Sequence, residues 1–309
     1  MSEQRFYYND FSTYLRKRFG CKVQKITLDG GFTCPNRDGT VGRGGCTFCN
    51  NQTFNPAYCH REKPIREQMS EGIAFFAHKY PEMRYLAYFQ AYTNTYDSLS
   101  ALQRRYEEAL SVDGCLGIVI GTRPDCMPGD LLDYLQRLSE QTFVLVEYGV
   151  ESTCDATLSR INRGHDYAVA VDAVTRTAER NIPVGVHMIL GLPGETRQDI
   201  MKQASVLSKL PITTLKLHQL QLIRGTRMAR EFEEVPSDFH LFTLDGYIET
   251  VVDYVERLRP DIVLERFASQ SPKELLIAPD WGIKNYELVE MVKRRMRERD
   301  TWQGRLFVG

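Results

Sequence analysis

The chain has 309 residues, with 39 lysines and arginines against 40 aspartates and glutamates, so its formal net charge is −1. Its composition, 42% hydrophobic and 26% charged, excludes a disordered chain. The balanced charge also excludes a broadly basic nucleic-acid coat protein. The first twenty residues lack the apolar core of a secretory signal, and no stretch approaches 18 uninterrupted apolar residues. We therefore expect a cytoplasmic protein with no membrane partner.

Seven β-rich segments alternate with segments of helical periodicity along the chain. The predicted strands are Val23–Leu28, Arg84–Gln90, Leu116–Thr122, Thr142–Val150, Val184–Leu190, Thr213–Leu220 and Asp261–Phe267. Helices are predicted between them, two of which begin after the favourable N-cap residues Asp166 and Thr196. Two further helices are predicted at Tyr247–Arg259 and in the tail from Lys284.

This alternation is typical of parallel strands joined by right-handed crossovers, which fits a doubly wound sheet or a (β/α) barrel. No GxGxxG follows the first strand, which disfavours a dinucleotide-binding fold. We therefore predict an α/β protein built on a (β/α) partial TIM-like barrel, with its site at the C-terminal ends of the strands. In the absence of a linker-like segment, residues 1–309 are expected to form one domain. Its parts would be a helical extension (1–22), the barrel core (23–267) and a second helical extension (268–309).

A loop rich in glycine after the first strand contains Cys34, Cys46 and Cys49. Cys46 and Cys49 form a C-x2-C pair, which presents two thiolates to one metal centre. Three thiolates suit a [4Fe–4S] cluster that keeps one iron without a protein ligand. The main alternative is a structural zinc site with Cys59 or His60 as fourth ligand, in a zinc-stabilised RNA-binding module without redox chemistry. A barrel enzyme with purely structural cysteines is a further alternative.

The cysteine loop and several motifs resemble those of radical S-adenosylmethionine (SAM) enzymes. The C-x11-C-x2-C spacing is longer than the usual C-x3-C-x2-C. Its context, KITLDGGFTCPNRDGTVGRGGCTFCN, nevertheless resembles the YhcC/YtqA-type subgroup, which is related to the radical enzyme subunit of Elongator. The resemblance continues through GTRPD (121–125), YGVES (148–152), INRGHDY (161–167), HMILGLPGET (187–196) and IRGT (223–226).

The resemblance implies a [4Fe–4S] cluster on the three cysteines and SAM as the second cofactor, cleaved to a 5′-deoxyadenosyl radical that abstracts hydrogen from a substrate. Residues 90–95 occupy the place of the family's Gly-Gly-Glu-like motif, so either backbone carbonyls of this segment or the side chains of Gln90 and Thr93 are candidate SAM contacts. Glu151 is a candidate acceptor for the SAM ribose or amine, and Arg163 a candidate partner for its carboxylate. A structural Glu–Arg ion pair is the alternative for these two residues. Gly191 either lets the backbone approach the adenine or ribose, or simply forms a turn.

Other polar residues are candidates for lesser roles. His187, Lys216 and His218 either line a substrate cavity or are satisfied by neighbouring carboxylates. Arg123 and Asp125 are expected to brace the site through a salt bridge or turn, and the remaining thiols Cys59, Cys126 and Cys154 to be packed.

Partners are implied by the resemblance rather than by these residues. It points to transfer RNA, through wobble uridine modification, as a substrate and to a reducing donor such as flavodoxin or ferredoxin. Basic clusters at 16–18 and 293–302 could bind phosphates, but their spacing favours a solvated helix face.

Overall fold

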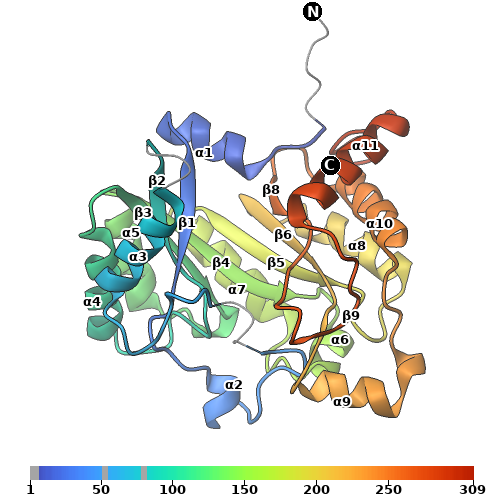
Figure 1. The fold of residues 1–309 in the computed structure, drawn as a ribbon, viewed down its shortest axis with the longest axis horizontal. Coiled ribbons are helices and arrows are strands. Elements are labelled where there is room, and N and C mark those ends of the chain that lie inside the picture. Colours follow the sequence, from blue (N-terminus) through green and yellow to red (C-terminus); the bar gives the residue numbers. More distant parts are fainter. Residues whose placement is uncertain (1–6, 51–54, 78–81) are drawn as a thin grey trace, which may run out of the picture.

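The computed structural model describes residues 7–50, 55–77 and 82–309. Seven parallel strands form one curved sheet in the order β1-β2-β3-β4-β5-β6-β8 (Figure 1). They are β1 (Val23–Leu28), β2 (Arg84–Phe89), β3 (Cys115–Thr122), β4 (Phe143–Glu151), β5 (Val184–Leu190), β6 (Thr214–Gln219) and β8 (Val263–Arg266). Each predicted strand coincides with an observed one. Spatial order follows chain order without the reversal of a doubly wound sheet, which confirms the predicted partial barrel.

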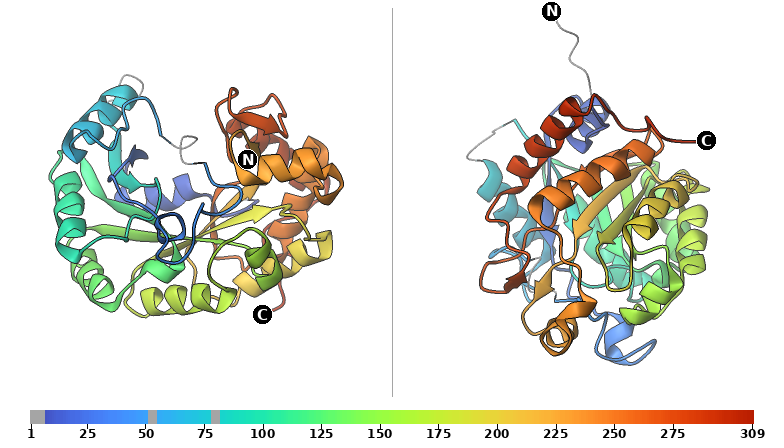
Figure 2. Two further views of the ribbon diagram at one scale, coloured as in Figure 1. Left: turned by 90° about the horizontal axis from the view of Figure 1, so that it is seen from below. Right: turned by 90° about the vertical axis from the view of Figure 1, so that its right-hand side faces the viewer.

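The connecting helices form an outer arc around the strands (Figure 2). This arc contains α3 (Ile65–Ala77), α4 (Leu99–Leu110), α5 (Gly129–Ser139), α7 (Tyr167–Ala178), α8 (Arg197–Leu207) and α10 (Leu244–Arg257). The remaining helices are α1 (Phe11–Phe19), α2 (Pro35–Asp38), α6 (Asp155–Arg160), α9 (Arg227–Glu234), α11 (Asn285–Glu298) and two 3-10 turns at Pro124–Cys126 and Pro236–Asp238. No helix within the described ranges is long and apolar enough to cross a membrane.

Both predicted N-caps are confirmed. The Asp166 carboxylate accepts a hydrogen bond from the Val169 N–H at 3.1 Å, at the start of α7. Thr196 and Asp199 form a reciprocal capping box at the start of α8. These side chains satisfy helix N–H groups that have no partner within the helix, so they fix where each helix begins.

Several short elements of the described ranges were not predicted from the sequence. Among them are the helices α2, α6 and α9 and the strands β7 (Leu222–Ile223) and β9 (Leu276–Ala278), which pair in an antiparallel sheet. The shortest of them, α2, β7 and β9, have too few residues to show a hydrophobic period, and short helices have little stability of their own. These elements are therefore stabilised by contacts with the rest of the barrel.

The inward face of the sheet is layered, because alternate residues of each strand point to the same side. At the N-terminal end of the strands, Leu86, Val119 and Leu145 pack with Leu15 of α1 in an apolar cluster. Helix α1 therefore closes this end of the half-barrel. The opposite, outward face of the sheet packs against the arc of helices in the main hydrophobic core.

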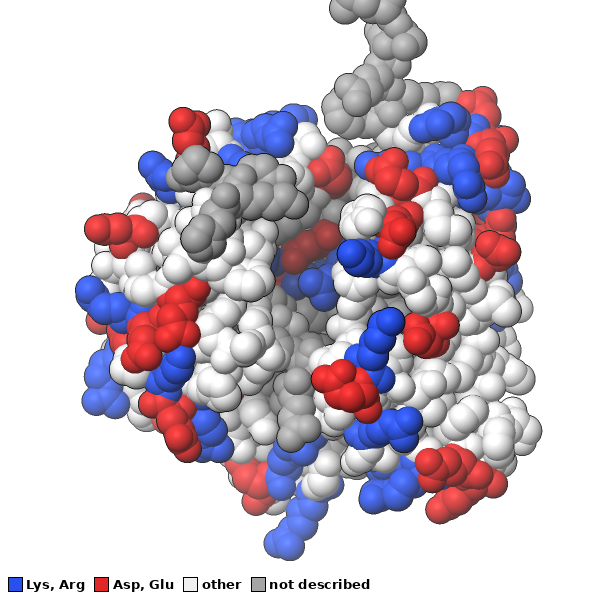
Figure 3. Space-filling view, viewed as in Figure 1, with Lys and Arg blue, Asp and Glu red and all other residues white. Residues whose placement is uncertain are grey.

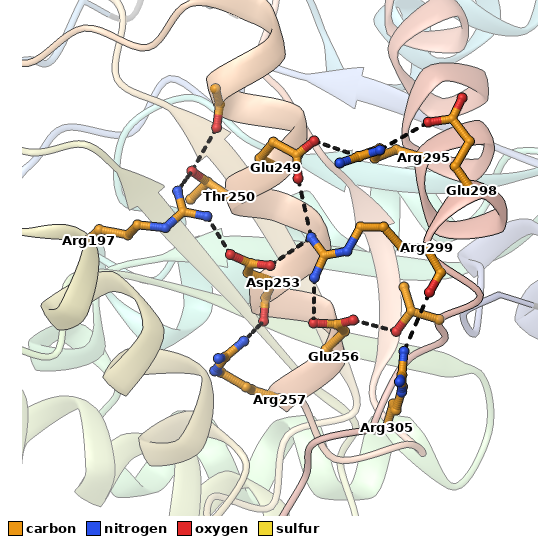
Figure 4. Close-up of polar contacts among 12 residues, drawn as sticks. Arg197, Glu249, Thr250, Asp253, Glu256, Arg257, Arg295, Glu298, Arg299 and Arg305 are labelled. Atoms are coloured by element: carbon orange, nitrogen blue, oxygen red, sulfur yellow. Dashed lines mark hydrogen bonds and ion pairs between the residues drawn. The ribbon is translucent and has the colours of Figure 1, made fainter.

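The C-terminal segment is attached to the barrel by an ion-pair network between α10 and α11 (Figure 4). The Arg299 guanidinium lies 3.3 Å from Glu249, 2.7 Å from Asp253 and 3.0 Å from Glu256. Arg295 pairs with Glu249 at 2.5 Å. These two arginines of the basic 293–302 cluster thus face acidic residues of α10, and the network fastens α11 to the helical arc.

Replacing Leu15 by alanine tests whether α1 closes the barrel. Leu15 is 3% exposed, and Leu→Ala at such sites costs about 2–5 kcal/mol because a cavity remains. We expect Leu15→Ala to lower the free energy of unfolding by this amount in urea titrations. The matched change Leu306→Ala, at a residue 47% exposed, should have a much smaller effect. Equal effects of the two changes would show that α1 is not part of the core.

Candidate active site

A cavity opens at the C-terminal ends of the strands, as predicted. Figure 3 shows the molecule hollowed between its two sides, with acidic and basic side chains inside the hollow. Most of the residues predicted from the sequence line the cavity, namely Cys34, Cys46, Cys49, Gln90, Thr93, Glu151, Arg163, His187, Lys216 and His218. Residues from seven strands and the loops after them are thereby brought to one place.

The cysteine loop is folded back on itself by α2 and by glycines. Cys34 precedes α2, and its carbonyl accepts hydrogen bonds from the N–H groups of Arg37 and Asp38 at 2.8 and 3.1 Å. Gly44 and Gly45 have φ values of +81° and +79°, which side chains with a Cβ rarely adopt. The turn that they form carries Cys46 and Cys49 back toward Cys34.

Hydrogen bonds attach this loop to the segment that follows α6. The Asn36 amide donates to the Asn162 carbonyl at 2.6 Å, and the Asn162 amide donates to the Gly45 carbonyl at 2.8 Å. The Thr47 N–H donates to the Ile161 carbonyl at 2.9 Å. The loop is therefore held in a fixed position relative to the neighbouring Arg163.

Polar N–H groups surround the cysteine sulfurs. Arg163 Nη1 lies 3.4 Å from the Cys46 Sγ, and the Asn36 amide nitrogen lies 3.7 Å from it. Burial and the neighbouring Cys46 raise the pKa of Cys49 to about 11, while the Arg37 guanidinium opposes this shift. Bound iron would lower the pKa of Cys49, as Arg37 does, because metal ligation requires the thiolate.

The donor set fits a cluster and an attached polar ligand. Within the described residues, no three candidate ligands converge on a single metal ion. A cubane needs no such convergence, because each thiolate binds a different iron. Buried atoms without a hydrogen-bond partner also belong to cavity-lining residues: Thr93 Oγ1, Arg123 Nη1 and Arg163 Nε. Unpaired buried polar atoms are costly and mark places where a bound polar molecule would be stabilised.

Glu151 and Arg163 lie close together, but they do not form a tight ion pair. Glu151 ends β4 with φ +68°, where the pairing register with β5 shifts. Arg163 Nη2 is 3.9 Å from the Glu151 carboxylate, and it donates to the Gly149 carbonyl. Burial raises the pKa of Glu151, and Arg163 opposes this rise. The two side chains thus retain hydrogen-bonding capacity at the cavity wall.

Arg123 and Asp125 form the predicted brace. Two guanidinium nitrogens of Arg123 each lie 2.8 Å from an Asp125 oxygen. Arg123 also donates to the Arg163 carbonyl at 2.8 Å. The predicted salt bridge is therefore confirmed, and it is bidentate. It orients Arg123, whose hydrogen bond to the Arg163 carbonyl fixes the backbone there.

A compensated group of charges lies at the floor of the cavity. The Glu147 carboxylate, which is fully buried, is 2.6 Å from both Lys25 and Lys216 and 3.0 Å from His187. Lys25 lies 2.7 Å from Glu265 of β8, so it bridges the open side of the half-barrel. His187 and Lys216 are therefore satisfied by a neighbouring carboxylate, which was one of the two predicted alternatives. Both residues also line the cavity, which was the other.

Sequence reasoning did not identify several site residues, among them Asn36, Arg37, Lys25 and Glu265. Lys25 and Glu265 could have been identified, since alternation along their predicted strands puts both side chains on the face of the sheet that points into the barrel. No local pattern marks the contacts of Asn36 or Arg37, which depend on how the loop folds.

Gly191 lies apart from the cavity lining. A Cβ at this position would meet the Phe242 ring at 2.8 Å, and its φ of +88° favours glycine. Of the other thiols, Cys59 and Cys126 are buried and Cys154 is exposed. The expectation of a packed thiol is thus confirmed for the first two and wrong for Cys154, which lies at the N-cap of α6.

Residues 36–205 match the Radical SAM superfamily model, and residues 212–298 match that of the Radical_SAM C-terminal domain. The chain therefore belongs to the radical SAM superfamily and is a radical SAM enzyme. The second match begins before β6 and runs to the end of α11. Membership of this family implies a [4Fe–4S] cluster and SAM.

Two relatives resemble the chain along most of its length. YtqA of Bacillus subtilis is 36% identical over 97% of this chain and 92% of its own length. YhcC of Escherichia coli K12 is 38% identical over 88% of this chain and 87% of its own length. The predicted similarity to the YhcC/YtqA-type subgroup is therefore confirmed.

The fold also resembles that of a solved archaeal structure. The archaeal Methanocaldococcus infernus Elp3 superposes with a TM-score of 0.69 at 15% identity, covering 91% of this chain and 64% of that chain. A tRNA uridine(34) acetyltransferase from M. infernus is 23% identical over 60% of this chain and 34% of its own length. The chain thus spans about a third of that enzyme.

Replacing Glu147 by glutamine tests the charge compensation at the cavity floor. Lys216 and Lys25 hold the pKa of Glu147 well below its usual range despite burial. The stabilisation is therefore complete above the usual glutamate pKa of about 4.3, and it is lost as the pH falls through the lower folded value. We expect Glu147→Gln to cost about 3–5 kcal/mol at pH 7, because two buried lysines lose a partner.

This difference should begin to shrink when urea titrations are repeated below about pH 4, since Glu147 of the unfolded wild-type chain takes up a proton there while the folded carboxylate stays ionised down to its lower pKa. The exposed Glu140→Gln provides the control and should be nearly neutral at every pH. A loss at pH 7 no larger than that of the control would refute the compensation.

Proposed function

We propose that Cys34, Cys46 and Cys49 hold a [4Fe–4S] cluster and that the adjoining cavity binds SAM and a substrate from which hydrogen is abstracted. The observation that carries this proposal is the placement of three thiols from one loop at the wall of a cavity that also contains Arg163. The Arg163 guanidinium contacts Cys46 and lies beside Glu151. The same side chain thus reaches both the cysteine loop and the strand end that would bind the cofactor.

When bound, the cluster supplies an electron that cleaves the SAM sulfonium to methionine and a 5′-deoxyadenosyl radical. The residues of this chain would bind, orient and shield the cofactor. Arg163 is assigned to the SAM carboxylate, Glu151 to its ribose or amine, and Gln90 and Thr93 to the same cofactor. Their burial around the cavity excludes water, which would otherwise intercept reactive species.

A reducing environment suits this chemistry. None of the eight cysteines, all of which lie in the described ranges, forms a disulfide, as is usual in the cytoplasm. The electron would come from a small redox protein such as flavodoxin or ferredoxin. We further propose that residues 1–309 act as one domain, with 1–22 and 268–309 as helical extensions of the 23–267 barrel. In support of this, the Asn9 N–H donates to the Gln303 side chain at 3.0 Å, which joins the two extensions.

We propose transfer RNA as the substrate, with modification of the wobble uridine as the reaction. The similarity to a tRNA uridine(34) acetyltransferase supports this assignment. Fold alone does not determine substrate, so the assignment rests on that similarity and not on the barrel.

Removing a cluster ligand is the direct test of the metal site. Anaerobically purified wild-type protein should be brown and contain about four irons per chain. Cys34→Ala, Cys46→Ala and Cys49→Ala should each abolish formation of 5′-deoxyadenosine from SAM under dithionite, while far-UV circular dichroism remains unchanged. Cys154→Ala, which removes an exposed thiol, serves as the matched control and should keep both iron and cleavage. A colourless wild-type protein with one zinc, or SAM cleavage by Cys34→Ala, would overturn the assignment.

Deleting the gene tests the substrate. Nucleosides from bulk transfer RNA of the deletion strain should lack a modified uridine that is present in the parent, when both are analysed by liquid chromatography and mass spectrometry. Expression of the wild-type chain should restore that nucleoside, and expression of Cys34→Ala should not. An unchanged nucleoside profile would refute transfer RNA as the substrate. It would not bear on the proposal that the three cysteines hold a cluster.

A further inference from the structure

The cavity has two sides, and only one of them is formed by the cysteine loop. The three cysteines, Glu151 and Arg163 line the side formed by the cysteine loop and β4. The opposite side is formed by β6, β8 and the segments after them, including Gln221, Arg266, Ser269 and Ser271. Since SAM must reach the cysteine loop, this second side is left for the substrate.

The charges at the floor between the two sides cancel. Lys25 and Lys216 each contact Glu147, and they lie 2.7 and 3.1 Å, respectively, from Glu265. Two cations and two carboxylates thus compensate one another. This group has no excess charge to offer a ligand.

The charge of Arg266, unlike the charges of Lys25 and Lys216, is not balanced by a carboxylate in contact with it in the described part of the chain. It lies at the end of β8, in register with Lys216 of β6, and it is half-buried at the cavity wall. Its guanidinium has no hydrogen-bond or ion-pair partner among residues 7–50, 55–77 and 82–309. A half-buried guanidinium with unused donors is a strong site for a carboxylate or phosphate group.

His218 of β6 adds a second unsatisfied polar atom on the same side. Its Nε2 is buried and has no hydrogen-bond partner among the described residues, and its ring lies 5.6 Å from that of His187. Burial and the neighbouring His187 and Arg266 lower the pKa of His218, so its imidazole is neutral and can donate one N–H.

The chain fixes these two residues on one wall. The Gln219 side chain donates to the Ser269 carbonyl at 3.0 Å and accepts from the Ser269 N–H at 2.9 Å. This pair of hydrogen bonds ties the segment after β8 to the end of β6. Arg266 and His218 are therefore held on adjacent strands before any ligand arrives.

We propose that Arg266 and His218 form a subsite for an anionic group of the substrate, a carboxylate or a phosphate. The proposal deepens the proposed function, on which it rests, by naming the chemistry of the second ligand. Ile189, Leu220 and Ile223 also line the cavity and provide an apolar surface for the remainder of that molecule.

Thermal unfolding of the anaerobically prepared holoenzyme tests the subsite. Acetate and inorganic phosphate are the probes, titrated at constant ionic strength against chloride, with saturating SAM present to occupy Arg163. A ligand that binds only the folded state raises Tm in a saturable way. We expect this response in the wild type, and at least tenfold weaker apparent affinity in Arg266→Gln. Arg137→Gln, which alters an exposed arginine of α5, should respond like the wild type.

A second variant, His218→Phe, keeps the test valid if Arg266→Gln does not fold, and it should also weaken the response. A response to acetate alone assigns a carboxylate, and a response to phosphate alone assigns a phosphate. No saturable response in the wild type, or the same half-saturation in both variants as in the wild type, overturns the subsite. Iron content and SAM cleavage of the same wild-type preparation separate the two proposals, because intact cleavage without anion binding refutes the subsite only.

Discussion

The position of the Arg163 guanidinium is the constraint on which the rest of the site depends. It donates toward the Cys46 sulfur and to the Gly149 carbonyl, so it joins the cysteine loop to the end of β4. Its backbone carbonyl accepts from Arg123, which Asp125 holds in turn. Loops carry binding residues precisely positioned only when a rigid scaffold fixes them. Here that scaffold is the parallel sheet, and Arg163 links the end of β4 to the glycine-rich cysteine loop.

The fold could be predicted from the sequence because its signals are local and repeated. Each inner strand is a short apolar run, and each crossover helix has an apolar stripe that faces the sheet. Caps such as Thr196 with Asp199 reinforce the same boundaries. By contrast, α2, α9 and the β7–β9 pair are short and form through contacts with distant segments. Propensity over a few residues cannot predict such elements, since tertiary contacts decide them.

The site was predictable only in part, for a related reason. Glu147 and Glu151 are separated by four residues along β4, a spacing that puts both on one face of the strand, and the structure shows that only Glu147 is matched by close ion pairs. The partners of Glu147 come from β1 and β6, and no sequence spacing links them. For Gly191, the positive φ and the closeness of the Phe242 ring account for a glycine at this position of the motif.

The central claim is that three thiolates leave one iron of the cluster open to SAM. Electron–nuclear double resonance on the dithionite-reduced holoenzyme tests it most directly, with SAM labelled by ¹⁵N at its amine and ¹⁷O at its carboxylate. The account predicts hyperfine coupling of both labels to the cluster spin, because both groups would bind the open iron. A reduced cluster that shows no coupling to either label, with saturating SAM present, would contradict it.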